Sequence, residues 1–150
     1  MPPSAELLWR LNREYVNRLV KARNYLGLLE HVVLTRSAEE TRTRLLPTLQ
    51  ITRDRLNQLS EAHRGWCYAY FYESAESKRM VQNAQAVRRA LNSFGHMRAQ
   101  NGGSFDDLAA TLYELPRPAP AVTRLPNGDL WEMVQVALYD LINLDASLEN

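Results

Sequence analysis

Three histidines and one cysteine are the side chains best suited to bind a metal ion or to act as a nucleophile: His31, His63, His96 and Cys67. A metal centre needs several such ligands to converge on one point. Each histidine falls on a different segment with helical patterning. In an antiparallel arrangement His31 and His63 would be separated by roughly 19 residues, about 28 Å at the rise of an α-helix. The spacing therefore predicts no metal site.

Catalysis and cofactor binding find no support in the remaining motifs. Cys67 lies in an aromatic run, where a buried and neutral thiol is expected. The chain has no glycine-rich phosphate loop, nucleophile elbow or dinucleotide fingerprint. Gly102 and Gly103 precede a short helix, but Asp106 and Asp107 in its first turn would repel a phosphate. We predict no catalytic residue, no cofactor and no enzymatic activity.

Cations and amides on the third helical segment form the best candidate face for a nucleic acid or another anion. From Ser77 to Phe105 the sequence has no acidic residue. Polar residues recur there every three or four positions and so share one helix face. Cations could contact phosphates, and amides could contact bases or backbone. The alternative is a solvated face, neutralised by the acidic C-terminal helix or by another subunit. This candidate face comprises Lys78, Gln82, Gln85, Arg89, Asn92 and His96.

Apolar residues beyond those that one buried stripe requires mark a candidate interface. The first helical segment carries a second apolar line beside its buried one. Near the end of the second segment, Trp66 and Tyr70 continue that segment's buried line at α-helical spacing. Further aromatic side chains surround the helix there, which only several neighbours could bury completely. Tyrosine and tryptophan are common in interfaces, although core packing or a ligand pocket would also use them. The candidate interface comprises Trp9, Val16, Val20, Trp66, Tyr68, Tyr70 and Tyr72.

Hydrophobic residues recur at intervals of three and four along most of the chain, which predicts amphipathic helices. A capping box at Ser37–Glu40 should begin the second helix, and Pro47 should kink it. Another capping box at Asp129–Glu132 should begin the last helix. The predicted helices cover about residues 5–35, 37–74, 76–98, 104–115 and 129–150.

Together these segments predict an all-α fold. We expect an antiparallel, up-down-up helical bundle of four long helices plus one short helix, with a Pro-rich crossover before the C-terminal helix. Pro116, Pro118 and Pro120 should make that crossover extended. The single domain 1–150 would divide into a basic three-helix unit (1–100), a short helix with the crossover (101–128), and an acidic C-terminal helix (129–150).

Composition narrows the classes of function. The chain has 150 residues, 45% of them hydrophobic, enough to bury a core. Its first 100 residues carry 16 Lys and Arg against 9 Asp and Glu, whereas the last 50 carry 2 against 8. One cysteine excludes an internal disulfide and favours a reducing compartment. With no export signal and no apolar run of membrane-spanning length, we expect a cytoplasmic protein without membrane contact.

A non-enzymatic interaction or structural protein is the function that these observations favour. The protein would form a homo-oligomer or dock a protein partner through its surplus apolar surface. Nucleic-acid binding, DNA or RNA, through the polar face of the third helix is the alternative.

Overall fold

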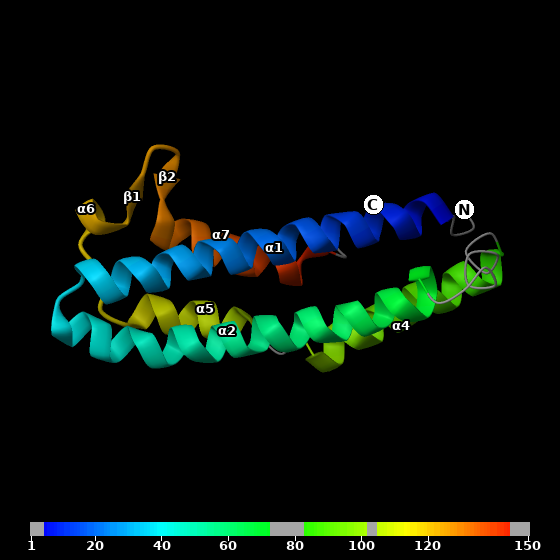
Figure 1. Cartoon of the computed structure of the whole chain (residues 1–150), viewed down its shortest axis with the longest axis horizontal. Helices are drawn as coiled ribbons and strands as arrows, with labels where there is room; N and C mark the ends of the chain where they lie inside the picture. Colours follow the sequence, from blue (N-terminus) through cyan, green and yellow to red (C-terminus); the bar gives the residue numbers. More distant parts are fainter. Residues whose placement is uncertain (1–4, 73–82, 102–104, 145–150) are drawn as a thin grey trace.

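Helix accounts for 88% of the residues described in the computed structural model, which confirms the all-α fold. The structure describes residues 5–72, 83–101 and 105–144. Figure 1 shows how its elements are arranged. In chain order they are α1 (Ala5–Arg36), α2 (Glu39–Cys67), the π-helix η1 (Tyr68–Tyr72), α4 (Ala84–Asn101), α5 (Phe105–Glu114), α6 (Pro120–Thr123), β1 (Arg124–Leu125), β2 (Gly128–Asp129) and α7 (Leu130–Ile142).

Helix α1 follows the periodicity of its sequence. Its main apolar line recurs every three or four residues, and each member of that line is buried. The helix packs mainly against α7 and α2. No helix among the described residues is long and apolar enough to cross a bilayer. The buried line comprises Leu8, Leu11, Tyr15, Leu19, Ala22, Leu26, Leu29 and Val33.

The link between α1 and α2 corrects the predicted capping box. The N-cap of α2 is Ala38, which makes no side-chain cap hydrogen bond, and Ser37 Oγ is buried without a partner among the described residues. Because α1 extends to Arg36, Ser37 falls one position too early to cap α2. Arg42 supports the link instead, since its guanidinium donates to the carbonyl oxygen of Leu34 at 3.3 Å. Helix α2 then continues through Pro47.

The aromatic run is helical, as expected, but its buried face differs from the prediction. From Tyr68 the chain forms a π-helix, whose hydrogen bonds join residues five apart. Phe71, five residues after Trp66, is therefore buried. Tyr70, expected to share the buried face with Trp66 at α-helical spacing, is only half-buried. The π-helix moves the core position from Tyr70 to Phe71.

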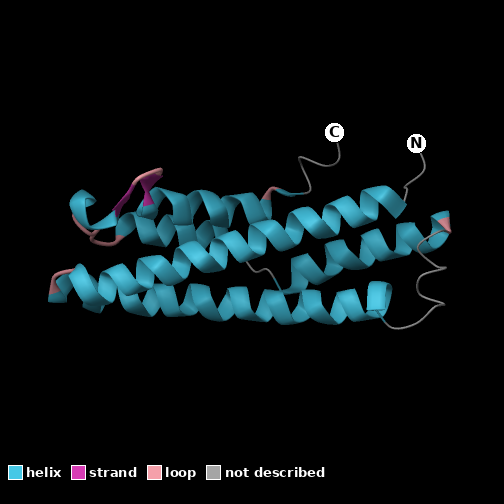
Figure 2. Cartoon of the chain, turned by 45° about the horizontal axis from the view of Figure 1, so that its top comes forward, coloured by secondary structure: helices cyan, strands magenta, loops and turns pink. Residues whose placement is uncertain are grey.

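The four positions of the bundle are filled unequally. Helices α1 and α2 run the length of the molecule, whereas α4 and α5 follow one another along the third position (Figure 1 and Figure 2). Helix α7 has 13 residues and lies beside α1 and α5. Helices α1, α2, α4 and α7, together with the shorter α5, match the expected bundle of four longer helices plus one short helix. The predicted helical residues 76–82 and 145–150 lie outside the described residues.

The two halves of the bundle have different cores. Where α7 is present, the interior consists mainly of leucines such as Leu29, Leu49 and Leu138. At the α4 end, rings fill the space between α1, α2 and α4. Phe94 is central there, because its ring centroid lies 5.0 Å from those of both Tyr15 and Trp66. Large rings can fill an interior that is surrounded by fewer helices.

The Pro-rich crossover is more structured than predicted. After the irregular residues 116–119, Pro120 begins the single turn α6, and a two-stranded hairpin follows. Leu125 pairs with Gly128, whose φ of 149° suits glycine. Asp129 then caps α7, as expected, because its Oδ1 accepts a hydrogen bond from the backbone N–H of Trp131 at 2.9 Å.

Candidate functional site

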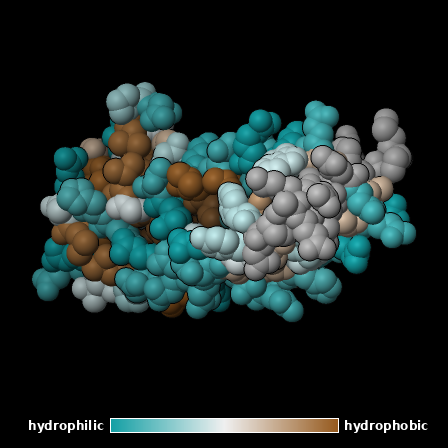
Figure 3. All heavy atoms as spheres, turned by 45° about the vertical axis from the view of Figure 1, so that its right-hand side comes forward, coloured by the Kyte–Doolittle hydropathy of each residue, from teal (hydrophilic) through white to brown (hydrophobic). Residues whose placement is uncertain are grey.

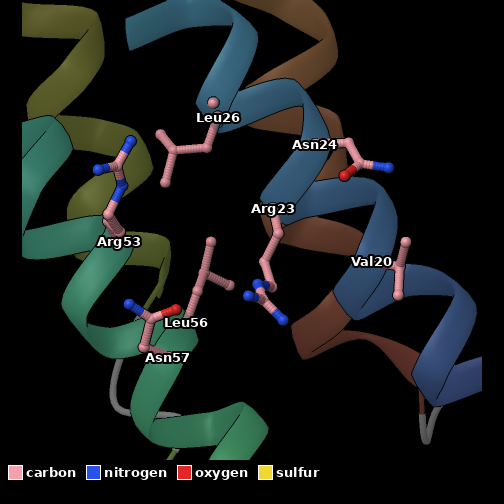
Figure 4. Close-up of a pocket in the computed structure, with 8 residues that line it drawn as sticks. Val20, Arg23, Asn24, Leu26, Arg53, Leu56 and Asn57 are labelled. Carbon is pink, nitrogen blue, oxygen red and sulfur yellow. The ribbon is translucent and has the colours of Figure 1, made fainter.

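A pocket of about 360 Å³ opens between α1 and α2 (Figure 4). Leu26 and Leu56 are buried members of the core and give the pocket an apolar floor. Arginine and asparagine side chains from both helices surround that floor. The pocket is lined by Val20, Arg23, Asn24, Leu26, Gly27, Arg53, Leu56 and Asn57.

The two arginines of the pocket differ electrostatically. Arg53 forms an ion pair with Glu30, whose side chain is only 10% exposed. Arg23 is exposed and forms no ion pair within the described part of the chain. In Figure 4 it reaches from α1 toward α2. Together, Arg23, Arg53 and Glu30 carry one net positive charge.

An exposed apolar line extends along α1 on both sides of this pocket. Trp9, Val20 and Leu34 are 50%, 47% and 51% exposed, and Val16 is partly buried. Intervals of seven, four and fourteen residues place all four on one side of the helix. The crossover helix α6 lies at the opposite end of α1 from Trp9 (Figure 1). The described crossover therefore leaves this line open.

The tyrosines of η1 continue the same face. Tyr68 and Tyr72 are 55% and 67% exposed, with ring centroids 5.7 Å apart. Tyr68 follows the pocket residue Asn57 by eleven residues, three helical turns, and so lies on the same side of α2. The exposed tyrosines and the apolar line define one surface, called the α1–α2 face below. It comprises Trp9, Val16, Val20, Leu34, Tyr68 and Tyr72.

Trp66 does not belong to this surface, which corrects its place among the candidate interface residues. Its side chain is 5% exposed, and its ring stacks on that of His63 at 6.0 Å between centroids. Tyr70, half-buried, packs on Trp66 at 5.4 Å. The reason is the position of Trp66 on the core side of α2, where α1 and α4 enclose it. Trp66 therefore belongs to the ring cluster of the core, and the partly buried Tyr70 packs against it.

Apolar side chains are also exposed elsewhere, so the α1–α2 face is distinguished by the alignment of its exposed residues rather than by the amount of apolar surface. Figure 3 shows hydrophobic side chains at the surface mainly toward the hairpin end of the molecule. Leu28, Ile51, Tyr113 and Val136 are about half exposed or more. Each lies on a different helix, so they form no line along one element. Among the described residues, the α1–α2 face has the longest aligned series.

A polar cluster inside the bundle brings together residues that the sequence analysis did not connect. His63 Nε2 lies 2.7 Å from Asn12 Oδ1, and Cys67 Sγ lies 3.4 Å from the same nitrogen. The i,i+4 spacing of His63 and Cys67 on α2 was the available signal. Asn12 enters from α1, and nothing in the local sequence indicates that contact.

The cluster is unsuited to nucleophilic catalysis despite its composition. Burial raises the pKa of Cys67 to about 11 and lowers the pKa of His63 to about 4. Thiol and imidazole are therefore both neutral near pH 7, and neither is exposed. A reactive cysteine needs a thiolate and access to its substrate. The cluster contributes to the core, in agreement with the buried neutral thiol expected for Cys67.

The candidate nucleic-acid face is exposed where it is described. Gln85, Arg89, Asn92 and His96 all lie at the surface of α4, whereas Lys78 and Gln82 fall outside the described residues. Neutralisation of this face by the acidic last helix, which is part of the alternative interpretation, is not seen within residues 83–144. Arg89 forms no ion pair there, since α4 packs on α2 and α1 while α7 packs on α1 and α5.

Metal ligation and similarity to known proteins add no further assignment. Across the described ranges, no group of three His, Cys, Asp or Glu side chains could hold a metal ion. No protein family, no curated protein and no solved structure matches the chain.

Proposed function

We propose that the protein is a non-enzymatic interaction module that binds a second protein surface, either another copy of itself or a different protein, through the α1–α2 face. The aligned exposure of Trp9, Val20 and Leu34 along α1 carries this proposal. Monomeric proteins rarely expose contiguous apolar patches, and larger ones mark sites of interaction. The expected setting of this contact is the cytoplasm.

The composition of the face suits a protein interface. Its aromatic side chains combine apolar area with polar tips, as is common where two proteins meet. Exposed arginines such as Arg13 and Arg23 border the apolar line. Arginine is enriched in interfaces, whereas lysine is depleted. Binding would therefore combine apolar burial along α1 with directional contacts from the border.

Charge insertion into the apolar line tests this proposal. We expect sedimentation velocity to show an oligomer, or a stable complex with a co-purifying protein. The double substitution Val20→Glu and Leu34→Glu should dissociate either assembly while circular dichroism remains unchanged. Leu28→Glu is the matched control, because Leu28 is 48% exposed on the same helix but lies off the line.

Two results would contradict the interaction proposal. One is a wild-type chain that is monomeric at all accessible concentrations and co-purifies with no protein. The other is equal dissociation by Leu28→Glu, which would show that the α1–α2 face has no special role. Loss of helicity in the double variant would show that the monomer needs the apolar line on α1 in order to fold.

Nucleic-acid binding through α4 is a second candidate, favoured by one observation. Helix α4 contains no acidic residue, and neither Arg88 nor Arg89 has a carboxylate within ion-pair distance in the described structure. Such cations could contact phosphates. Filter binding should then show an affinity that falls steeply with salt, and Arg88→Ala with Arg89→Ala should lower the salt slope by about one to two. No retention at low ionic strength would exclude it.

A further inference from the structure

We propose that the pocket between α1 and α2 binds a small monocarboxylate that carries a compact apolar group. The proposal concerns a free small molecule, which would compete with a protein partner for part of the α1–α2 face because Val20 and Arg23 line the pocket. Arginines from two helices stand over a floor of leucines in this pocket. The charge, the volume and the open floor of the pocket together determine the class of ligand.

The charges at the pocket favour a single negative charge on the ligand. Arg23 is free to form a forked pair of hydrogen bonds with a carboxylate, the geometry for which a guanidinium is suited. Arg53 is already paired with Glu30. The net charge of +1 is matched by a carboxylate, whereas a phosphate dianion would leave an unbalanced charge close to Glu30.

The ion pair also fixes the second arginine in place. Glu30 is largely buried and holds one edge of the Arg53 guanidinium. Arginine has five N–H donors, so the pair with Glu30 leaves donors of Arg53 for a further partner. Its side chain is 45% exposed, which leaves it within reach of a ligand. A ligand carboxylate would therefore pair with Arg23, while the fixed Arg53 side chain, which points away from Arg23 in Figure 4, bounds the pocket on the side of Glu30.

The volume and floor of the pocket limit the rest of the ligand. A volume of about 360 Å³ lies at the low end for small-molecule sites. At about 30 Å³ for each water-sized group, the ligand would have on the order of ten non-hydrogen atoms. Leu26 and Leu56 provide apolar contacts below it. Asn57 lies beside Leu56 at the rim, whereas the Asn24 amide points away from α2 (Figure 4).

Gly27 keeps the floor open. It lies in the interior of α1, where glycine is unfavourable, and a Cβ built on it would meet no atom within 4 Å. Packing within the described chain therefore gives no reason for glycine at this position. The same holds for Gly65 and Gly95, so Gly27 matters here because it lines the pocket and leaves space in it.

The test is an NMR titration of the full chain with 3-phenylpropionate, followed through the backbone amides of Gly27 and Asn57. A ligand of this size should give saturable shifts with a dissociation constant on the order of 1 mM. The neutral 3-phenylpropanamide should bind at least about fivefold more weakly, because it lacks the charge that pairs with Arg23.

Three variants locate the site. Arg23→Gln should weaken binding at least about fivefold by removing the free guanidinium. Gly27→Phe should abolish binding by filling the pocket, and Gly27→Ala, which adds one methyl group, should retain it. Arg13→Gln is the control, because Arg13 is an exposed arginine of α1 that does not line the pocket.

Each alternative outcome overturns the proposal. No saturable shift up to about 20 mM ligand would show that the pocket is not a site for this class. Equal binding of the amide would show that the carboxylate takes no part in recognition. Tighter binding of inorganic phosphate would show that the pocket does not prefer a ligand with a single negative charge. Equal weakening of binding by Arg13→Gln and Arg23→Gln would show that the loss comes from the overall charge of the protein and not from a contact in the pocket. If Gly27→Phe does not fold, the two arginine variants still decide.

Discussion

The side chains of His63 and Asn12 join α2 to α1 by a hydrogen bond of 2.7 Å inside the ring cluster. Donation from His63 Nε2–H to Asn12 Oδ1 requires the tautomer protonated at Nε2. Cys67 Sγ lies 3.6 Å from the same amide oxygen, so Asn12 accepts from both side chains. The interior thus depends on a histidine that stays neutral, and this dependence has consequences for stability.

Acidification should destabilise the fold through His63. Burial lowers its pKa in the folded state to about 4, against about 6.5 in the unfolded chain. Between these values the unfolded chain binds the proton more readily, so the free energy of unfolding should fall as pH falls from 6.5 to 4. The loss should approach about 3 kcal/mol. Urea unfolding at several pH values measures it.

The variant His63→Gln provides the control for this pH dependence. Glutamine can still donate to Asn12 but does not titrate, so its unfolding free energy should change less with pH in the same window. A wild-type curve as flat as that of the variant would show that His63 ionises normally in the fold.

Cys67 should be unreactive in the native protein. Burial raises its pKa to about 11, so the thiolate, which is the reactive form, is scarce at pH 8. Ellman's reagent should label one thiol per chain rapidly in denaturant, since the chain has one cysteine. In native buffer the rate should be at least about a hundredfold lower, set by opening of the fold. Rapid labelling without denaturant would contradict the buried position.

Phe94 should be among the most costly residues to truncate. It is 1% exposed, and its ring lies against those of Tyr15, Trp66 and His63. Phe94→Ala should lower the free energy of unfolding by about 3–5 kcal/mol. Trp9→Ala is the comparison, since Trp9 is half exposed and should cost much less. Chemical denaturation measures both, and equal losses would mean that the ring cluster does not centre on Phe94.

Periodicity predicted most of the fold because the geometry of an α-helix is fixed. Each residue of the main apolar line on α1 is buried, since a repeat of 3.6 residues leaves little freedom. The prediction was wrong where that repeat changes. After Cys67 the π-helix alters the turn, so Phe71 replaces Tyr70 in the core. In residues 66–72 nearly every side chain is aromatic, so the sequence shows no alternation of polar and apolar residues that would indicate a change in helical repeat.

The candidate site was harder to predict than the fold. The exposed line of Trp9, Val16 and Val20 could be read from spacing on one helix. The pocket is lined by Arg23 of α1 and Arg53 of α2, and which residues of the two helices line it depends on the register between them. Register follows from how side chains interdigitate across the two helices, and the periodicity of either helix alone does not contain it.

The ion pair between Arg117 and Asp129 should contribute less to stability than the helix cap made by the same aspartate. Burial alone would raise the pKa of Asp129, but hydrogen bonds from Thr123 and Trp131 and the charge of Arg117 outweigh it and lower the pKa. The ionised form therefore stabilises the fold at neutral pH, and this contribution should be lost as pH falls below about 4.

Substitutions at both positions separate the two contributions. Asp129→Ala removes cap and ion pair and should cost about 1–2 kcal/mol. Asp129→Asn keeps an oxygen that can cap α7 and should cost less. Arg117→Gln removes only the ion pair, which is partly exposed and should contribute about 0–1 kcal/mol. Thermal or urea unfolding of the three variants at pH 7 gives the order. Equal losses for Arg117→Gln, Asp129→Asn and Asp129→Ala would show that the ion pair, rather than the cap, holds the hairpin against α7.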